Sequence, residues 1–377
     1  MPYDITKRKI NIMGAGVTPA LATRRRRSLA KNVYAKDIKE GDRVETSFLV
    51  IKKETGMSKT GKAYLNLKLR DSTGDLEARV WDNAESVGEC FSKDDVVAIK
   101  GSAILYQGKI QVNVSEARTL SVEDCSIRDY LPSSKRTPED MMTELDSIIS
   151  GMGDRHLKRL MKDIFSDAVL RERFMTAPAA KTMHHPYLGG LIEHVLSLCS
   201  IGRFVASHYE GINKDLLISG AILHDIGKIY ELSYSRTFDY TDEGRLLGHI
   251  TIGVELVDSK INAIADFPRR LGVLLKHMLL SHHGHLEFGS PKRPKTLEAM
   301  ALYFLDDFDA KMNSMQSLIK SEAGTGDWTD YQRALERYIY KGSYASDESP
   351  FVPGGEEKKP ESGQPEADEK DNLRLFK

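Results

Sequence analysis

A histidine and an aspartate stand side by side at His224 and Asp225, where an apolar helical run ends at a glycine. Further histidines lie on both sides of this doublet, and an acidic run follows near position 306. Imidazole nitrogens and carboxylate oxygens in this order can bind one or two divalent metal ions. The candidate metal ligands are His194, His224, Asp225, His249, His282, His283 and Asp306. Such cations activate water and neutralise phosphate charge, so the pattern predicts metal-assisted hydrolysis of a phosphate ester.

Single members of this set are weak signals, because a lone histidine is more often a core or surface residue than a metal ligand. The joint pattern is stronger, because each candidate has a glycine or an apolar neighbour that allows burial. Lys228 could contact a phosphate oxygen, or it could be an ordinary cation at a helix C-terminus. His184 and His185 could contact the substrate or hydrogen-bond a metal ligand from behind. The catalytic candidates are therefore Asp225, Lys228 and His185.

Ligands spread this widely along the chain require several helices that converge on one point. The apolar residues adopt a helical period after Thr137-Pro138, a pair typical of a helix start. Helices are expected from residue 138 onward and then over about 154–166, 167–176, 189–209, 214–223, 247–265, 267–281, 295–320 and 328–340. Residues 137–342 therefore predict an all-α domain.

Residues 33–120 have the alternating period of strands instead. Strands are expected over 43–53, 63–70, 76–81, 96–105 and 109–120, with a short helix near 84–91. This order is typical of the OB-fold, a small Greek-key barrel that commonly binds single-stranded nucleic acid by aromatic stacking. The candidate nucleic-acid contacts are Tyr64, Lys68, Arg79, Trp81 and Tyr106. The barrel could also bind a protein or be structural, with Trp81 in its core.

The expected fold is thus multidomain, an all-β OB-fold barrel (33–120) joined by a linker (121–136) to an all-α helical bundle (137–342). Residues 1–32 form a basic arm that contains four consecutive arginines and is expected to be disordered. This arm could touch nucleic acid, or it could be a leader without a role. A third alternative is that translation starts at Met13 or later. The charged segment 343–377 is expected to be a disordered tail.

Composition is that of a globular protein, with 377 residues, 40% hydrophobic and 29% charged residues and a net charge of −1. Cys90, Cys125 and Cys199 are too widely spaced for a disulfide framework or a zinc knuckle, which favours a reducing compartment. No apolar run approaches the roughly 20 residues that span a bilayer. The stretch before Arg24 is short and mixed and lacks the apolar region of a signal peptide. We therefore expect a cytoplasmic protein without a membrane partner.

Several stretches resemble those of HD-domain metal-dependent phosphohydrolases, and in detail those of the YhaM-type 3′-to-5′ exoribonucleases, which join an OB-fold to an HD domain. They are residues 184–194, 221–228, 248–249, 281–284, 288–291, 294–299 and 305–312, within a resemblance that covers roughly 33–342. The resemblance implies a core metal set of His194, His224, Asp225 and Asp306, with Asp225 bridging to a second site at His249, His282 and His283. It favours Asp306 over Asp307, because the ligand usually lies three residues before a further Asp-Ala pair, here Asp309-Ala310.

The resemblance further implies a metal-dependent 3′-to-5′ exonuclease that releases nucleoside 5′-monophosphates from single-stranded RNA. Single-stranded DNA is a second candidate substrate, and a homo-oligomer that encloses the strand would suit a processive enzyme. The resemblance favours Mn²⁺, while mixed histidine and carboxylate ligation also suits Fe²⁺, Co²⁺ or Ni²⁺.

Two other functions are open from the sequence. One is hydrolysis of a small nucleotide or a cyclic dinucleotide. Enzymes of this superfamily that act on cyclic dinucleotides carry Gly-Tyr-Pro after the paired histidines, and residues 284–291 lack the tyrosine. Nucleotidases of the superfamily usually lack an OB module. The other is a regulatory protein with a decayed metal site, which the complete ligand set disfavours.

Overall fold

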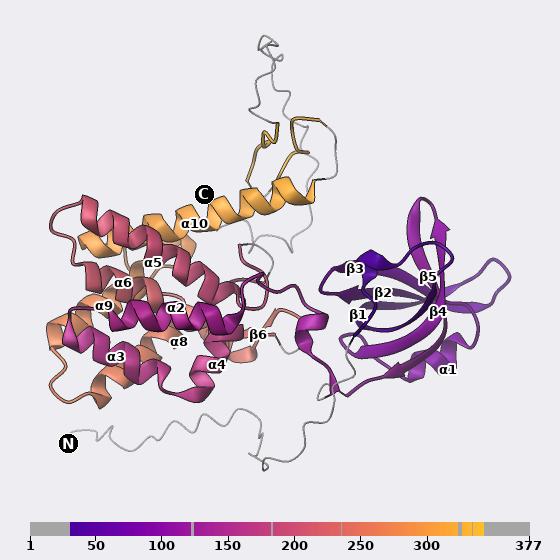
Figure 1. The fold of residues 1–377 in the computed structure, drawn as a ribbon, viewed down its shortest axis with the longest axis horizontal. Coiled ribbons are helices and arrows are strands. Elements are labelled where there is room, and N and C mark those ends of the chain that lie inside the picture. The colour runs from indigo at the N-terminus through magenta and orange to yellow at the C-terminus, as the bar shows by residue number, and fades with distance from the viewer. Residues whose placement is uncertain are drawn as a thin grey trace, which may run out of the picture.

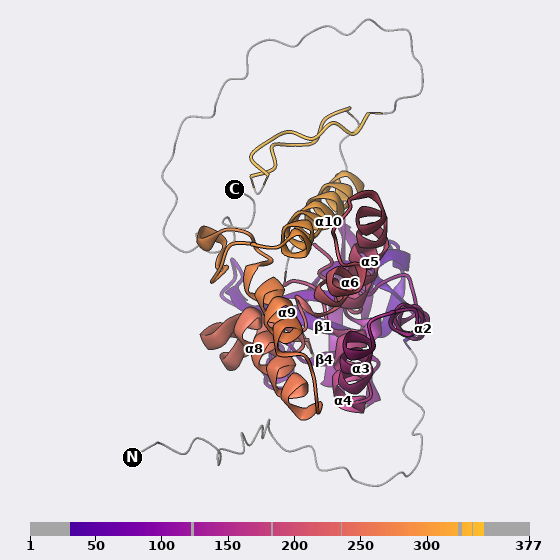
Figure 2. The same ribbon diagram turned by 90° about the vertical axis from the view of Figure 1, so that its left-hand side faces the viewer.

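The computed structural model describes residues 31–342, apart from 122–123, 182–183, 235, 323–325 and 334. A strand-built barrel and a larger helical body lie next to each other along the longest axis (Figure 1), and the view at 90° shows the barrel behind the helices (Figure 2). The expected basic arm, apart from its last two residues, and the expected tail 343–377 lie outside the described residues. Within the described ranges, no helix is long and apolar enough to cross a bilayer.

The barrel is closed by five strands in the order β1-β2-β3-β5-β4, with β3 and β5 parallel and the other pairs antiparallel. Alternate side chains of β2, namely Leu65, Leu67 and Leu69, point into its core and are buried. The elements are β1 (Arg43–Met57), β2 (Ala63–Asp71), β3 (Gly74–Val80), α1 (Ala84–Glu89), β4 (Val96–Tyr106) and β5 (Lys109–Thr119). The expected OB-fold is confirmed.

The helical body packs its helices around one large apolar core. Side chains at several helix starts accept backbone N–H groups, as Thr137 does from Asp140 and Asn213 does from Leu216. The helices are α2 (Pro138–Ser150), α3 (Arg155–Phe165), α4 (Ala168–Thr176), α5 (Gly190–His208), α6 (Lys214–Leu223), α7 (Lys228–Glu231), α8 (Asp242–Ala263), α9 (Arg269–Ser281) and α10 (Leu297–Ser321). The expected helical domain is confirmed.

Two elements differ from the sequence-based expectation. The helix expected at 328–340 is wrong, because the chain there pairs with itself, and the N–H of Thr329 donates to the carbonyl of Ile339 at 2.9 Å. Aromatic and β-branched residues in this segment favour the extended backbone. A short hairpin, β6 (Leu232–Ser233) paired with β7 (Asp239–Tyr240), was not expected and follows α7 directly.

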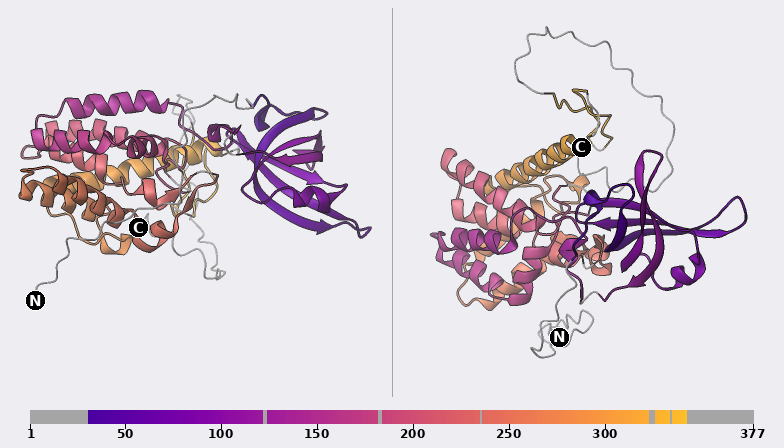
Figure 3. Two further views of the ribbon diagram at one scale, coloured as in Figure 1. Left: turned by 90° about the horizontal axis from the view of Figure 1, so that it is seen from below. Right: turned by 45° about the vertical axis from the view of Figure 1, so that its right-hand side comes forward.

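The two bodies meet through a small apolar cluster. Leu49 and Val96 of the barrel pack there with Leu131 and Leu188, and Phe238 of the β6–β7 hairpin lies against the cluster. Figure 3 shows the narrow contact from two further directions. The contact places the hairpin between the barrel and the helices.

Candidate metal centre

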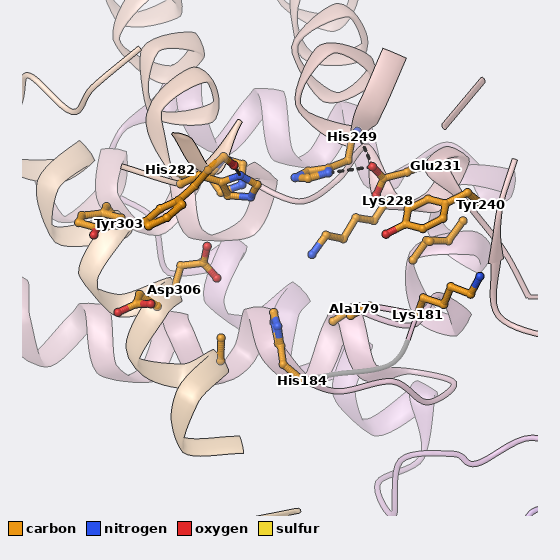
Figure 4. A pocket seen from close by; sticks show the side chains of 16 residues that line it. Ala179, Lys181, His184, Lys228, Glu231, Tyr240, His249, His282, Tyr303 and Asp306 are labelled. Atoms are coloured by element: carbon orange, nitrogen blue, oxygen red, sulfur yellow. Dashed lines mark hydrogen bonds and ion pairs between the residues drawn. The ribbon is translucent and has the colours of Figure 1, made fainter. Parts of the chain in front are cut away.

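The candidate ligands come from α5, from the α6–α7 junction, from α8, from the end of α9 and from α10. Figure 4 shows His249, His282 and Asp306 around one pocket. The exposed fractions of His194 and His224 are 0%, so these side chains lie in the core of the helical body. Helices distant in sequence thus converge on one point, as the spread of the ligands requires.

Two glycines allow α7 and α8 to approach each other. A Cβ atom on Gly227 would overlap the carbonyl oxygen of His249. Gly248 has a φ of 72°, in the left-handed region that glycine adopts without strain, and this conformation kinks α8 just before His249. The close approach brings His249 next to the His224-Asp225 doublet.

Asp225 lies at the middle of the ligand set. Its Oδ2 is 3.3 Å from the Nε2 of His224. Its Oδ1 is 3.4 Å from the Nε2 of His249 and 3.6 Å from the Nε2 of His282. The carboxylate therefore lies between two ligand groups, His194, His224 and Asp306 on one side and His249, His282 and His283 on the other.

The candidate histidines all turn the same ring atom toward this centre. The Nδ1 atoms of His194 and His249 are hydrogen-bonded to the carboxylates of Asp309 (2.8 Å) and Glu231 (3.0 Å). The Nδ1 atoms of the other three lie 2.9, 2.8 and 2.9 Å from backbone carbonyl oxygens, in the order His224, His282 and His283. An Nδ1–H that donates outward leaves the Nε2 lone pair for a metal ion.

Unpaired buried atoms show that this set fits divalent cations. Within the described residues, the Oδ1 of Asp225 and the Nε2 atoms of His249 and His282 are buried and have no hydrogen-bond partner. A buried polar atom without a partner costs about 1–3 kcal/mol. A cation between the two groups would be a partner for all three atoms, and imidazole with carboxylate suits first-row transition metals.

The ionised groups of the centre hold each other in their charged forms. Burial alone would raise the pKa of Asp225, but Lys228 and His224 outweigh burial and hold this pKa well below its usual range. Burial lowers the pKa of Lys228, but Asp225, with an oxygen 2.7 Å from the Nζ atom, raises it above its usual value. The site thus presents a carboxylate for cations and an ammonium group for a phosphate.

A second layer of side chains is hydrogen-bonded to the metal ligands. Asp309 accepts hydrogen bonds from the Nδ1 of His194, from the hydroxyl of Ser197 and, at 3.2 Å, from the Nε2 of His185. The Nδ1 of His185 faces the hydroxyl of Tyr187. His185 is therefore buried behind the metal ligands. Asp309 orients the metal ligand His194 through this hydrogen bond and does not line the pocket.

His184, by contrast, lines the pocket, and its Nε2 has no hydrogen-bond partner among the described residues. Burial lowers the pKa of His184 well below its usual value, so the ring is neutral. The structure therefore places His184 at the pocket wall, whereas the expected catalytic candidate His185 does not line the pocket.

Several residues of the site were missed in the sequence. Glu231 orients His249 through both its ring and its backbone N–H, and it lies one helical turn after Lys228, a spacing that could have indicated it. Lys181, Tyr240 and Tyr303 line the pocket, and no local pattern marks them. Asp307, which the resemblance disfavours as a ligand, forms an ion pair of 2.8 Å with Lys311.

The barrel carries a second candidate site on its outer surface. The guanidinium group of Arg79 lies 5.7, 5.3 and 5.2 Å from the ring centroids of Tyr64, Trp81 and Tyr106. The Tyr64 and Trp81 rings are 4.8 Å apart, and Trp81 is 38% exposed, so it is not a core residue. Lys68 is instead paired with Asp75 at 2.9 Å. The structure thus brings four of the five candidate contacts into one cluster.

Comparisons with known proteins match each part of this architecture. Residues 191–311 match the HD domain family, and residues 49–120 match the OB-fold nucleic acid binding domain family. The 3′-5′ exoribonuclease YhaM of Geobacillus sp. (strain WCH70) is 33% identical over 320 residues, which cover 84% of this chain and 97% of that protein.

Solved structures are similar to parts of the chain. The second OB-fold domain of replication protein A from Methanococcus maripaludis has 15% identity and a TM-score of 0.20, over 24% of this chain and 94% of that chain. The L. monocytogenes phosphodiesterase PgpH HD domain has 18% identity and a TM-score of 0.26, over 41% and 80%. The match to the exoribonuclease spans both domains, and the chain therefore belongs to the family of YhaM-type 3′-to-5′ exoribonucleases.

Proposed function

We propose that this protein hydrolyses single-stranded RNA from its 3′ end and releases nucleoside 5′-monophosphates in a reaction that depends on divalent metal ions. The observation that carries the proposal is Asp225, whose two carboxylate oxygens face two separate groups of metal-binding side chains beneath one pocket. The homologous exoribonuclease, which this chain matches across both domains, supports the same activity. Small-nucleotide hydrolysis is disfavoured, because the match includes the barrel.

The candidate ligands form two groups, one for each metal ion. His194, His224 and Asp306 would hold one ion, His249, His282 and His283 would hold the other, and Asp225 would be shared. When bound, these ions supply a hydroxide from water near neutral pH and neutralise phosphate charge. We infer Mn²⁺ from the family, with Fe²⁺, Co²⁺ and Ni²⁺ as alternatives that suit the same ligands.

Two further side chains would contact the scissile phosphate. The ammonium group of Lys228 lines the pocket and can stabilise negative charge that develops on a phosphate oxygen. The unpaired Nε2 of His184 faces the same space and can hydrogen-bond to a substrate oxygen. The pocket has a volume of about 180 Å³. This is below the roughly 300–1,000 Å³ of common ligand sites, so the pocket suits the end of a strand.

The aromatic cluster of the barrel would hold the strand upstream of the cut. Bases stack on exposed rings without regard to sequence, and Arg79 adds positive charge among them. Lys68 stays a predicted contact, and a phosphate would have to displace its partner Asp75. Single-stranded DNA as a substrate, a homo-oligomer and a cytoplasmic location also remain proposals; the free cysteines favour the last.

We expect that Trp81→Ala will weaken the binding of long RNA. Removal of a ring on which one base stacks costs about 1–3 kcal/mol of binding free energy. The KM for a long single strand should therefore rise about tenfold or more. The kcat and the hydrolysis of a dinucleotide should not change, because neither depends on the barrel. Trp328→Ala, which changes the other tryptophan at an exposed position, is the matched control. Equal KM values for Trp81→Ala and the control would remove the cluster from the binding site.

The test of the proposed function is a time course on 5′-labelled single-stranded RNA with Mn²⁺. We expect a ladder of labelled products that shorten one nucleotide at a time, with nucleoside 5′-monophosphates in the released fraction. RNA that stays intact, or internal fragments without a ladder, would contradict the proposal.

A further inference from the structure

The pocket has an aromatic ring at each of its two ends. Figure 4 shows Tyr303 and Tyr240 on opposite sides, with Lys228, Asp306 and His184 between them in this view. Both tyrosines line the pocket. RNA bases stack on tyrosine rings, and every internucleotide phosphate has one base on each side. A phosphate over the metal centre could therefore place one neighbouring base against each ring.

The two ends carry different charged residues, and each of these residues forms an ion pair. At the Tyr240 end the pocket is lined by Lys181, whose Nζ atom lies 5.8 Å from the centroid of that ring and 2.9 Å from an oxygen of Asp239. At the Tyr303 end it is lined by Asp307, one helical turn along α10, whose carboxylate lies 2.8 Å from the Nζ atom of Lys311. A strand that continues carries further phosphates and suits the cation, whereas a 3′-terminal nucleotide ends in hydroxyl groups that can donate to a carboxylate.

The two ends also differ in their relation to the barrel. Tyr240 belongs to the β6–β7 hairpin, whose Arg236 forms an ion pair of 2.7 Å with Asp95 at the start of β4. Phe238 of the same hairpin packs against the cluster that joins the two bodies. Figure 1 shows β6 on the side of the helical body that faces the barrel, whereas α10, which carries Tyr303, begins on the far side. A strand held by the barrel would reach the Tyr240 end first.

We propose that the pocket holds the phosphate between the last two nucleotides and that the rings at its two ends bind the flanking bases in a fixed direction, an inference that rests on the proposed exoribonuclease function. The 3′-terminal base stacks on Tyr303, and Asp307 accepts a hydrogen bond from a hydroxyl of the terminal ribose. The penultimate base stacks on Tyr240, and the next phosphate toward the 5′ end replaces Asp239 as the partner of Lys181.

This direction determines which bond is cut. A water oxygen bonds to the phosphorus between the two nucleotides, and the bond from this phosphorus to the 3′ oxygen of the penultimate nucleotide breaks. That oxygen takes a proton and becomes the new 3′ hydroxyl. The terminal nucleotide leaves with its 5′ phosphate from the Tyr303 end, while the shortened strand stays at the Tyr240 end.

The experiment compares three RNAs of one length with the full-length protein and Mn²⁺. One is intact, one lacks the base of the 3′-terminal nucleotide, and one lacks the base of the penultimate nucleotide. For the wild-type protein, each missing base should lower kcat/KM for the first cut by about tenfold or more, because one stacking contact is lost. Tyr303→Leu should abolish the penalty for the missing terminal base and keep the other penalty. Tyr240→Leu should show the reverse, and Tyr338→Leu, at an exposed tyrosine outside the pocket, should keep both penalties.

Each other outcome has a defined meaning. Exchanged penalties, with Tyr303→Leu insensitive to the penultimate base, would overturn the direction, and both penalties kept in both variants would overturn the stacking sites. A wild-type protein that leaves all three RNAs intact would contradict the proposed function itself, and the inference with it.

A second measurement does not need the tyrosine variants to fold. RNA with a 3′-terminal phosphate should be cut about tenfold or more slowly than RNA with a free hydroxyl, because that phosphate would lie against the Asp307 carboxylate. Asp307→Asn should restore most of this loss. Equal rates for the two RNAs with the wild-type protein would overturn the placement of the terminal nucleotide.

Discussion

Replacing Asp225 with asparagine is expected to lower kcat for RNA hydrolysis by at least about 10³-fold, more than loss of a single hydrogen-bond donor at an active site. Asparagine keeps the size of the side chain, but it removes the negative charge that both ligand groups share and presents an N–H₂ group where one carboxylate oxygen now faces the histidines. The Oδ2 and Oδ1 atoms face His224 and His249 at 3.3 and 3.4 Å, so both ions should bind less tightly.

The measurement for this prediction is kcat from single-turnover cleavage, together with the bound metal per chain. Asp258→Asn is the matched control, because Asp258 is also paired with a lysine, Lys276, and lies outside the pocket. A variant at position 225 that keeps activity within about tenfold of the wild type would exclude Asp225 as a shared metal ligand, since loss of outer-layer partners alone costs 10–100-fold.

Lys228→Met is expected to lower kcat by about 10²–10³-fold with little change in metal content. The ammonium group is nearly buried, with its side chain 11% exposed, and is the pocket-lining cation nearest to Asp225. Its charge should stabilise the phosphate most when negative charge develops in the transition state, so kcat should fall more than KM rises. Methionine keeps the apolar stem of the side chain and removes only the charge.

Metal analysis of the same variant separates catalysis from assembly of the site. If Lys228 only balances the charge of Asp225, the variant should lose metal and activity together. Lys276→Met, which breaks the comparable pair with Asp258, should change neither. Wild-type kcat in Lys228→Met would remove the lysine from the reaction.

The parts that could be predicted from the sequence are those encoded locally. Strict alternation in β2 and helical spacing in the second half indicate the barrel and the helical body, and the His-Asp doublet with its glycine marks the centre of the site. The helix predicted over 328–340 was wrong. The apolar spacing of this segment fits a helix, but its aromatic and β-branched residues favour the extended, self-paired backbone found there.

The roles of His184 and His185 could not be separated in the same way. Both residues have a positive φ, 42° and 52°, which is uncommon outside glycine, and only His184 of the two lines the pocket. A sequence pattern does not encode such a backbone. The pocket walls also lie beyond local patterns, because Lys181, Tyr240 and Tyr303 meet only after the hairpin and α10 are in place.

The measurement that tests the central claim most directly is a titration of metal-free protein with Mn²⁺. Bound manganese per chain and the rate of 3′-end RNA cleavage are followed together. We predict no cleavage in the metal-free protein, and a rate that rises with bound metal to a plateau at two ions per chain, as expected for two ligand groups that share Asp225. Full cleavage by protein that retains no metal would contradict the account.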